Sequence, residues 1–97
     1  MELEKIKLEI KRRLKKNPKE AIYSLDSVLA PSSHLYDTFI SIQSRYNELI
    51  REKAKGTISN DNYNIEFSRI CESILYLVSE IESEALLDIK KIDKQSN

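Results

Sequence analysis

The chain has 97 residues, 40% hydrophobic and 33% charged, and its sixteen lysine and arginine residues balance sixteen aspartate and glutamate residues. One glycine, one cysteine and one histidine exclude a glycine-rich phosphate loop, a cysteine metal site or disulfide framework, and any site that needs two histidines. No apolar run reaches the roughly 18 residues of a membrane span, and the acidic second residue argues against a signal peptide. We therefore expect one cytoplasmic, all-α domain with a single core, no cofactor, no metal and no enzymatic activity.

The first predicted helix spans residues 2–16, and a second begins at Pro18. Asparagine at position 17 is a good N-cap, proline suits the first helical position, and Pro31 is expected to end the second helix. In both helices the apolar side chains recur every three or four residues, which is typical of an amphipathic helix. The inward side chains are expected to be Leu3, Ile6, Ile10 and Leu14, then Ile22, Leu25, Val28 and Leu29.

The third and fourth helices are predicted to form an antiparallel hairpin. Ser32 and Ser33 can cap the third helix, Gly56 is suited to a left-handed C-terminal position, and Ser59 can cap the fourth helix. Ile58 and Tyr63 would form a hydrophobic staple around that last cap. Folding the chain back at Gly56 aligns five apolar layers, as a short connection demands. The layers are Leu49 with Phe67, Tyr46 with Ile70, Ile42 with Ile74, Phe39 with Leu77, and Leu35 with Ile81.

The apolar pattern of the fourth helix continues beyond Ile81 through Ala85, Ile89 and Ile92. It predicts a long C-terminal helix from Asn60 to about Asp93, roughly 50 Å in length, whose last part packs on the first or second helix or projects. The expected architecture is a small antiparallel bundle of four helices forming one domain over residues 1–93, with a disordered tail at 94–97.

Charge is distributed unevenly along the chain. Residues 1–20 carry eight basic and four acidic side chains, a balance of +4, whereas residues 61–88 carry seven acidic side chains against Arg69 alone, a balance of −6. Opposite poles on one molecule favour directed association, although a solvated charged surface with no partner is the alternative. The predicted basic face consists of Lys7, Lys11, Arg12, Arg13, Lys15 and Lys16. The predicted acidic face consists of Glu72, Glu80, Glu82, Glu84 and Asp88.

Candidate reactive groups are few. Cys71 and His34 are the one pair that could imitate a nucleophile and its base, but the hairpin register places His34 opposite position 82, about 16 Å along the axis from Cys71, and catalysis needs about 3 Å. Glu66 and Arg69 are spaced to form an ion pair, which Arg45 could join across the hairpin. We expect this group to be a structural clamp or part of a partner surface.

Two other functions remain open. The basic run from residue 11 to residue 16 could bind nucleic acid or an anionic surface, although no aromatic stacking groups accompany it and no nucleic acid is expected. A symmetric homodimer is the second alternative. It would use apolar residues that do not belong to the inward-facing layers of the hairpin, such as Ile40, Ile50, Leu75 and Tyr76.

The hairpin region also resembles a known family. Arg-Tyr at residues 45–46, Gly-x-Ile-Ser at 56–59 and Glu-x-x-Arg-Ile at 66–70 are together similar to the effector-associated domains of bacterial conflict systems, in particular the eleventh type, over about residues 35–82. Ser68 departs from the family, which often has asparagine there. The residues that carry the resemblance are Arg45, Tyr46, Gly56, Ile58, Ser59, Tyr63, Glu66 and Arg69.

The resemblance implies an adaptor in prokaryotic immunity and antiphage defence. Such domains are small helical bundles without catalytic residues, at a terminus of larger proteins, and they recruit an effector through like-with-like association. The implied partner is another effector-associated domain or a fused protease, TIR or NTPase module, and the implied state is a homo-oligomer. Our main hypothesis is that the basic first helix of one copy meets the acidic fourth helix of another.

Overall fold

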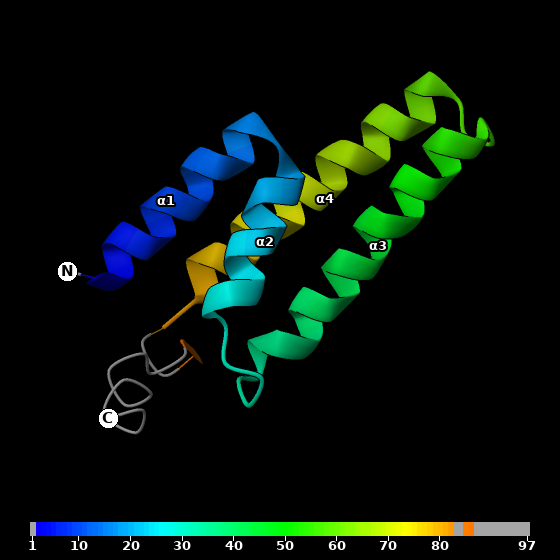
Figure 1. The fold of residues 1–97 in the computed structure, drawn as a ribbon. Helices are drawn as coiled ribbons and strands as arrows, with labels where there is room; N and C mark the ends of the chain where they lie inside the picture. Colours follow the sequence, from blue (N-terminus) through cyan, green and yellow to red (C-terminus); the bar gives the residue numbers. More distant parts are fainter. Residues whose placement is uncertain (1, 83–84, 87–97) are drawn as a thin grey trace.

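The computed structural model describes residues 2–82, 85 and 86, which form four α-helices and no strand. The helices are α1 (Glu2–Lys16), α2 (Pro18–Val28), α3 (Leu35–Lys55) and α4 (Asn60–Glu80). They make two antiparallel pairs, α1 with α2 and α3 with α4, and both α1 and α2 also pack against α4 (Figure 1). The predicted all-α bundle of four helices is confirmed.

The local signals at the helix ends act as predicted at most positions. The Asn17 side-chain oxygen accepts a hydrogen bond from the Lys19 backbone N–H at 3.0 Å, and the Ser59 hydroxyl accepts one from the Asn62 N–H at 3.1 Å. Gly56 adopts the left-handed conformation, with φ of 71°. These contacts satisfy backbone groups that a helix end otherwise leaves without partners.

The start of α3 differs slightly from the prediction. His34 holds the N-cap position and makes no capping hydrogen bond with its side chain. The Ser33 hydroxyl instead accepts a hydrogen bond from the Leu35 N–H at 3.1 Å, so one of the two predicted serines does satisfy a backbone donor at this end.

The core confirms the predicted hairpin register. Nine of the ten side chains in the five predicted layers are buried, and the tenth, Phe67, packs partly buried against them. The Lys53 ammonium lies over the Tyr63 ring, 4.5 Å from its centroid. The residue numbers of this pair add up to 116, as do those of each predicted layer, so the contact follows the same register. From the other helix pair, Ile10 and Leu25 reach the same core. Ala21, which was not among the side chains predicted to face inward, is also fully buried.

The predicted extension of the fourth helix is wrong. α4 ends at Glu80, and Ile81 adopts an extended conformation with ψ of 128°. One physical reason favours this end: Leu35 begins α3, so a longer α4 would have no part of α3 opposite it.

The chain instead turns onto the end of α2. The Ala30 backbone N–H donates to the Ala85 carbonyl at 2.8 Å, and Leu29 pairs with Leu86 in an isolated antiparallel bridge. Ala85 is thereby buried, so the predicted contact of this segment with the second helix is made at the residues just after α2 and not by a continuation of α4. Ile89, Ile92 and the predicted tail lie outside the described residues.

Candidate interaction surfaces

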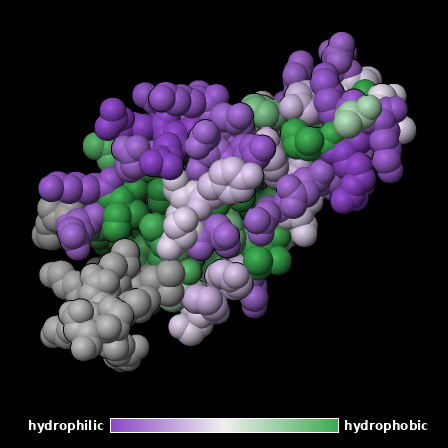
Figure 2. All heavy atoms as spheres, viewed as in Figure 1, coloured by the Kyte–Doolittle hydropathy of each residue, from purple (hydrophilic) through white to green (hydrophobic). Residues whose placement is uncertain are grey.

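The structure divides the predicted basic face into three groups. Lys11, Lys15 and Lys16 are exposed and make no ion pair within the described part of the chain. Arg12 and Arg13 both pair with Glu9, at 3.6 and 3.2 Å. Lys7 is half-buried, and its ammonium donates to the Ser79 carbonyl of α4 at 3.4 Å. The three exposed lysines therefore carry charge with no acidic partner among the described residues, and Figure 2 shows hydrophilic surface gathered over α1.

A hollow at the C-terminal end of α1 has mixed charge. Its volume is about 300 Å³, and two glutamates line it together with three cations. This mixture weakens the case for phosphate binding, because nucleic-acid surfaces are usually of one sign. The lining residues are Glu9, Arg12, Arg13, Lys16 and Glu20.

The described members of the predicted acidic face are exposed. Glu72, Glu80 and Glu82 lie on α4 and just beyond its end, whereas Glu84 and Asp88 fall outside the described residues. Glu80 accepts a hydrogen bond from Tyr76, and this bond together with the carboxylate charge raises the pKa of the phenol. Acidic side chains are thus accessible to a partner along α4.

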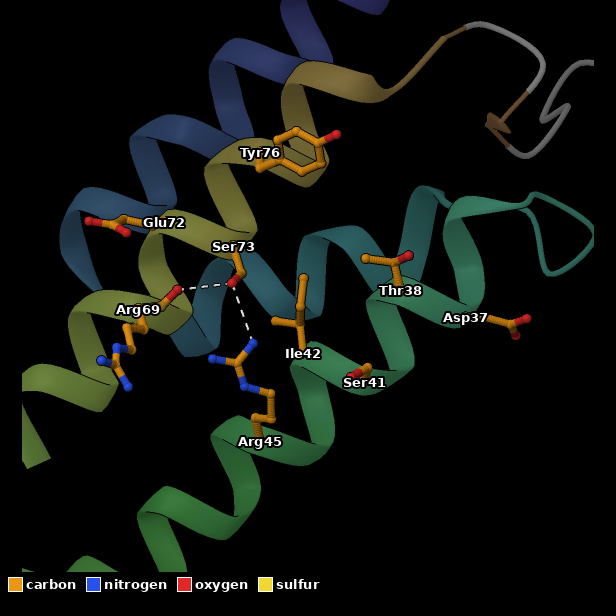
Figure 3. A pocket seen from close by; sticks show the side chains of 9 residues that line it. All are labelled: Asp37, Thr38, Ser41, Ile42, Arg45, Arg69, Glu72, Ser73 and Tyr76. Atoms are coloured by element: carbon orange, nitrogen blue, oxygen red, sulfur yellow. Dashed lines mark hydrogen bonds between the residues drawn. The ribbon is translucent and has the colours of Figure 1, made fainter.

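An open groove of about 720 Å³ runs between α3 and α4 (Figure 3). The Arg45 guanidinium crosses it and donates to the Ser73 hydroxyl at 3.4 Å, while that hydroxyl donates to the Arg69 carbonyl at 2.9 Å. Arg69 also pairs with Glu66 at 3.0 Å, as predicted. The predicted participation of Arg45 in that pair is wrong, because Ser73 lies within its reach. The groove is lined by Asp37, Thr38, Ser41, Ile42, Arg45, Arg69, Glu72, Ser73 and Tyr76.

The structure does not bring Cys71 and His34 together. Cys71 is half-buried within α4, and burial raises the pKa of its thiol, which disfavours the reactive thiolate. His34 is exposed at the start of α3 and shares a surface hollow with Glu82, the position that the register placed opposite it. Among residues 2–82, 85 and 86, no cluster of three or more metal-ligating side chains occurs.

Several large apolar side chains are exposed. The four selected from the sequence are exposed, at 40% for Ile40, 39% for Ile50, 43% for Leu75 and 64% for Tyr76. Tyr76 alone among them lines the α3–α4 groove. Three others are exposed as well: Leu8, which lies off the apolar spacing of α1, and Tyr23 and Ile65, which the sequence did not single out. No helix in the described part of the chain is long and apolar enough to cross a bilayer.

The sequence profile of the family described as effector-associated domain 11 matches residues 5–82. The chain belongs to this family. The match extends the predicted resemblance to α1 and α2, so it covers residues of all four helices. The effector-associated domain is also similar to a protein named Roc-COR-CHAT protease, from an unknown prokaryotic organism, with 33% identity over 76 residues.

That similarity covers 78% of this chain but 7% of the protease, so the chain spans a small fraction of the relative's length. In the relative, a domain of this type is therefore one part of a much larger protein. No solved structure shows significant similarity to the chain.

Proposed function

We propose that this effector-associated domain is a non-catalytic adaptor that brings effector proteins together by binding another domain of its own type. The observation that carries the proposal is the relative, in which a stretch like this one occupies 7% of a protein named as a protease. A small helical bundle attached to a large effector supplies a docking surface more readily than a second active site. The open surfaces and the absence of a nucleophile–base pair among the described residues support this role.

The proposed contact joins α1 of one copy to α4 of the next. Lys11 and Lys15 are one turn apart on the same side of α1, where like charges repel, and both are exposed without an acidic partner in the described residues. Glu72 and Glu80 are exposed on α4. Pairing the two surfaces relieves the repulsion. Because the surfaces differ, the contact is head-to-tail and can propagate or close into a ring.

Light scattering of the purified chain at different salt concentrations tests the proposal. We expect the average mass to fall as the salt concentration rises from about 0.05 to 0.5 M, because the Debye length shortens below 10 Å over this range. The double substitution Lys11→Glu and Lys15→Glu should reproduce the fall at low salt. A matched control, Arg51→Glu with Lys55→Glu at the hairpin tip, makes the same change in net charge away from α1 and should assemble like the unmodified chain.

Circular dichroism would confirm that both variants are folded. An assembly that is indifferent to salt and to the α1 substitutions would refute the electrostatic contact. Gel-shift and liposome-binding measurements on the same samples address the alternative of nucleic-acid or anionic-surface binding, for which the pairing of Arg12 and Arg13 with Glu9 leaves fewer free cations.

A further inference from the structure

The groove between α3 and α4 has a charge pattern that runs in a consistent order along α3. Asp37, Ser41 and Arg45 follow one another at intervals of four residues, and all three line the groove. Residues four apart lie on neighbouring turns of one helix face. The row therefore reads acidic, small, basic along the groove (Figure 3).

The two charged side chains in this row make few contacts within the described part of the chain. Asp37 is exposed and its side chain makes no hydrogen bond or ion pair within residues 2–82, 85 and 86. Arg45 is also exposed and makes one long hydrogen bond, to Ser73 at 3.4 Å. Eight residues separate Asp37 from Arg45, or roughly 12 Å along the helix, so the two cannot pair with each other.

Such a row can pair with an identical row that runs in the opposite direction, because the acidic end of each row then meets the basic end of the other. If a second copy approaches with its α3 running in the opposite direction and a two-fold axis near Ser41, Asp37 of one chain faces Arg45 of the other twice. Rows of residues four apart are also those that interdigitate in the commonest class of helix packing, and the small serine at the centre permits close approach. We propose that the α3–α4 groove is the docking site for a second copy of this chain in a two-fold symmetric dimer.

Tyr76 supports the position of the axis. The hairpin register places Leu77 opposite Phe39, and hence Tyr76 of α4 next to the middle of the α3 row. The Tyr76 ring is 64% exposed and projects at the edge of the groove (Figure 3). Exposed aromatic side chains near the centre of a contact surface are frequent binding anchors. In the two-fold arrangement both tyrosines lie close to the axis, where each is covered by the other chain.

This dimer goes beyond the adaptor contact proposed above, since it uses no residue of α1. The two contacts overlap at Glu72, which lines the groove and belongs to the acidic surface of α4, so beside the dimer the α1 contact would use Glu80 at the end of α4. A two-fold contact is closed and an α1–α4 contact is head-to-tail, so together they would build a larger assembly from dimers.

Charge-swapped chains test the two-fold arrangement directly. The test is made in a background chain that carries Lys11→Glu and Lys15→Glu, which remove the α1–α4 contact, and we expect sedimentation equilibrium of this chain to show a dimer. Asp37→Arg alone and Arg45→Asp alone, each added to this background, should give monomers, with the dissociation constant raised at least about tenfold, because each places like charges at both contacts. An equimolar mixture of the two variants should form a heterodimer, because every contact then joins an arginine to an aspartate. No head-to-tail contact through α1 predicts that rescue.

Controls keep the test independent of folding and of the adaptor contact. Circular dichroism of each variant reports the helical fold, and Lys11→Glu with Lys15→Glu should leave the dimer intact. Tyr76→Ala should weaken the dimer, whereas Tyr76→Phe, which keeps the ring and loses the hydroxyl, should preserve it. The proposal is wrong if the chain that carries Lys11→Glu and Lys15→Glu stays monomeric up to about 1 mM. It is also wrong if the single variants dimerise normally, or if the mixture stays monomeric.

Discussion

Gly56 is the residue on which the turn between α3 and α4 depends most directly. Its φ of 71° lies in the left-handed region, where a side chain brings Cβ close to the following carbonyl. The Gly56 N–H donates to the Lys53 carbonyl at 3.2 Å, and the Thr57 N–H donates to the Glu52 carbonyl at 3.1 Å. These bonds satisfy the last carbonyls of α3 and fix the direction in which the chain turns back.

Gly56→Ala should lower the free energy of unfolding by about 1 kcal/mol. A Cβ at this position would meet no atom within 4 Å, so the loss arises from backbone conformation and not from a clash. Gly56→Asn should be less destabilising, because asparagine tolerates the left-handed region better than alanine. Urea denaturation followed by circular dichroism measures both, and an alanine variant as stable as the unmodified chain would contradict the argument.

The helices show which parts of the fold are encoded locally. The bounds of α1, the cap at Asn17 and the turn at Gly56 could be predicted because each follows from a few adjacent residues. The end of α4 could not. Its apolar pattern continues past Glu80, and the pattern does not reveal that Ala85 gains a hydrogen bond and burial against Ala30, which lies 55 residues away in the sequence.

The contacts on the candidate surfaces also differ in whether the sequence could predict them. The Glu66–Arg69 pair was predictable because both partners belong to one helix. The contact of Arg45 with Ser73 was not, since it depends on the distance between two helices and on which of several polar groups lies nearest. The pairs of Glu9 with Arg12 and Arg13 are of the local kind, three and four residues apart on α1, so the sequence contained the signal although both arginines were assigned to a free basic face.

The Ser59 cap sets where α4 begins, and its removal should be measurable. Ser59→Ala should lower the free energy of unfolding by about 1 kcal/mol, the usual cost of losing an N-cap, because the Asn62 N–H loses its acceptor. Ser59→Asp keeps an acceptor at this end of the helix and should stay close to the unmodified chain. Ser44→Ala, at an exposed position within α3, is the matched control and should change stability by less than about 0.5 kcal/mol. Thermal and urea denaturation of the three variants decide the point; equal effects of Ser59→Ala and Ser44→Ala would show that the cap contributes nothing.

At the scale of the whole molecule, the four helices share one core but do not contribute to it equally. α3 and α4 supply nine buried residues between their two faces, five and four respectively, whereas α1 supplies Ile10 alone. Three other apolar side chains of α1 are partly buried, Leu3, Ile6 and Leu14, and Leu8 is exposed. Stability is not uniform in such an arrangement, because an element with few buried contacts opens at a lower free energy than the rest.

We therefore expect α1 to open before the α3–α4 hairpin, and Ile10→Ala to widen the difference. Truncating a buried isoleucine costs about 2 to 5 kcal/mol, and here the loss falls on the one fully buried side chain that attaches α1 to the bundle. Hydrogen–deuterium exchange should show the amides of α1 exchanging at least about tenfold faster in the variant, with the protection of α3 changed much less. Phe39→Ala is the contrasting substitution, because it removes a fully buried ring from the hairpin and should accelerate exchange throughout the chain. If Ile10→Ala accelerated exchange equally in all four helices, the bundle would be a single cooperative unit, and the basic lysines of α1 would be held as rigidly as the hairpin.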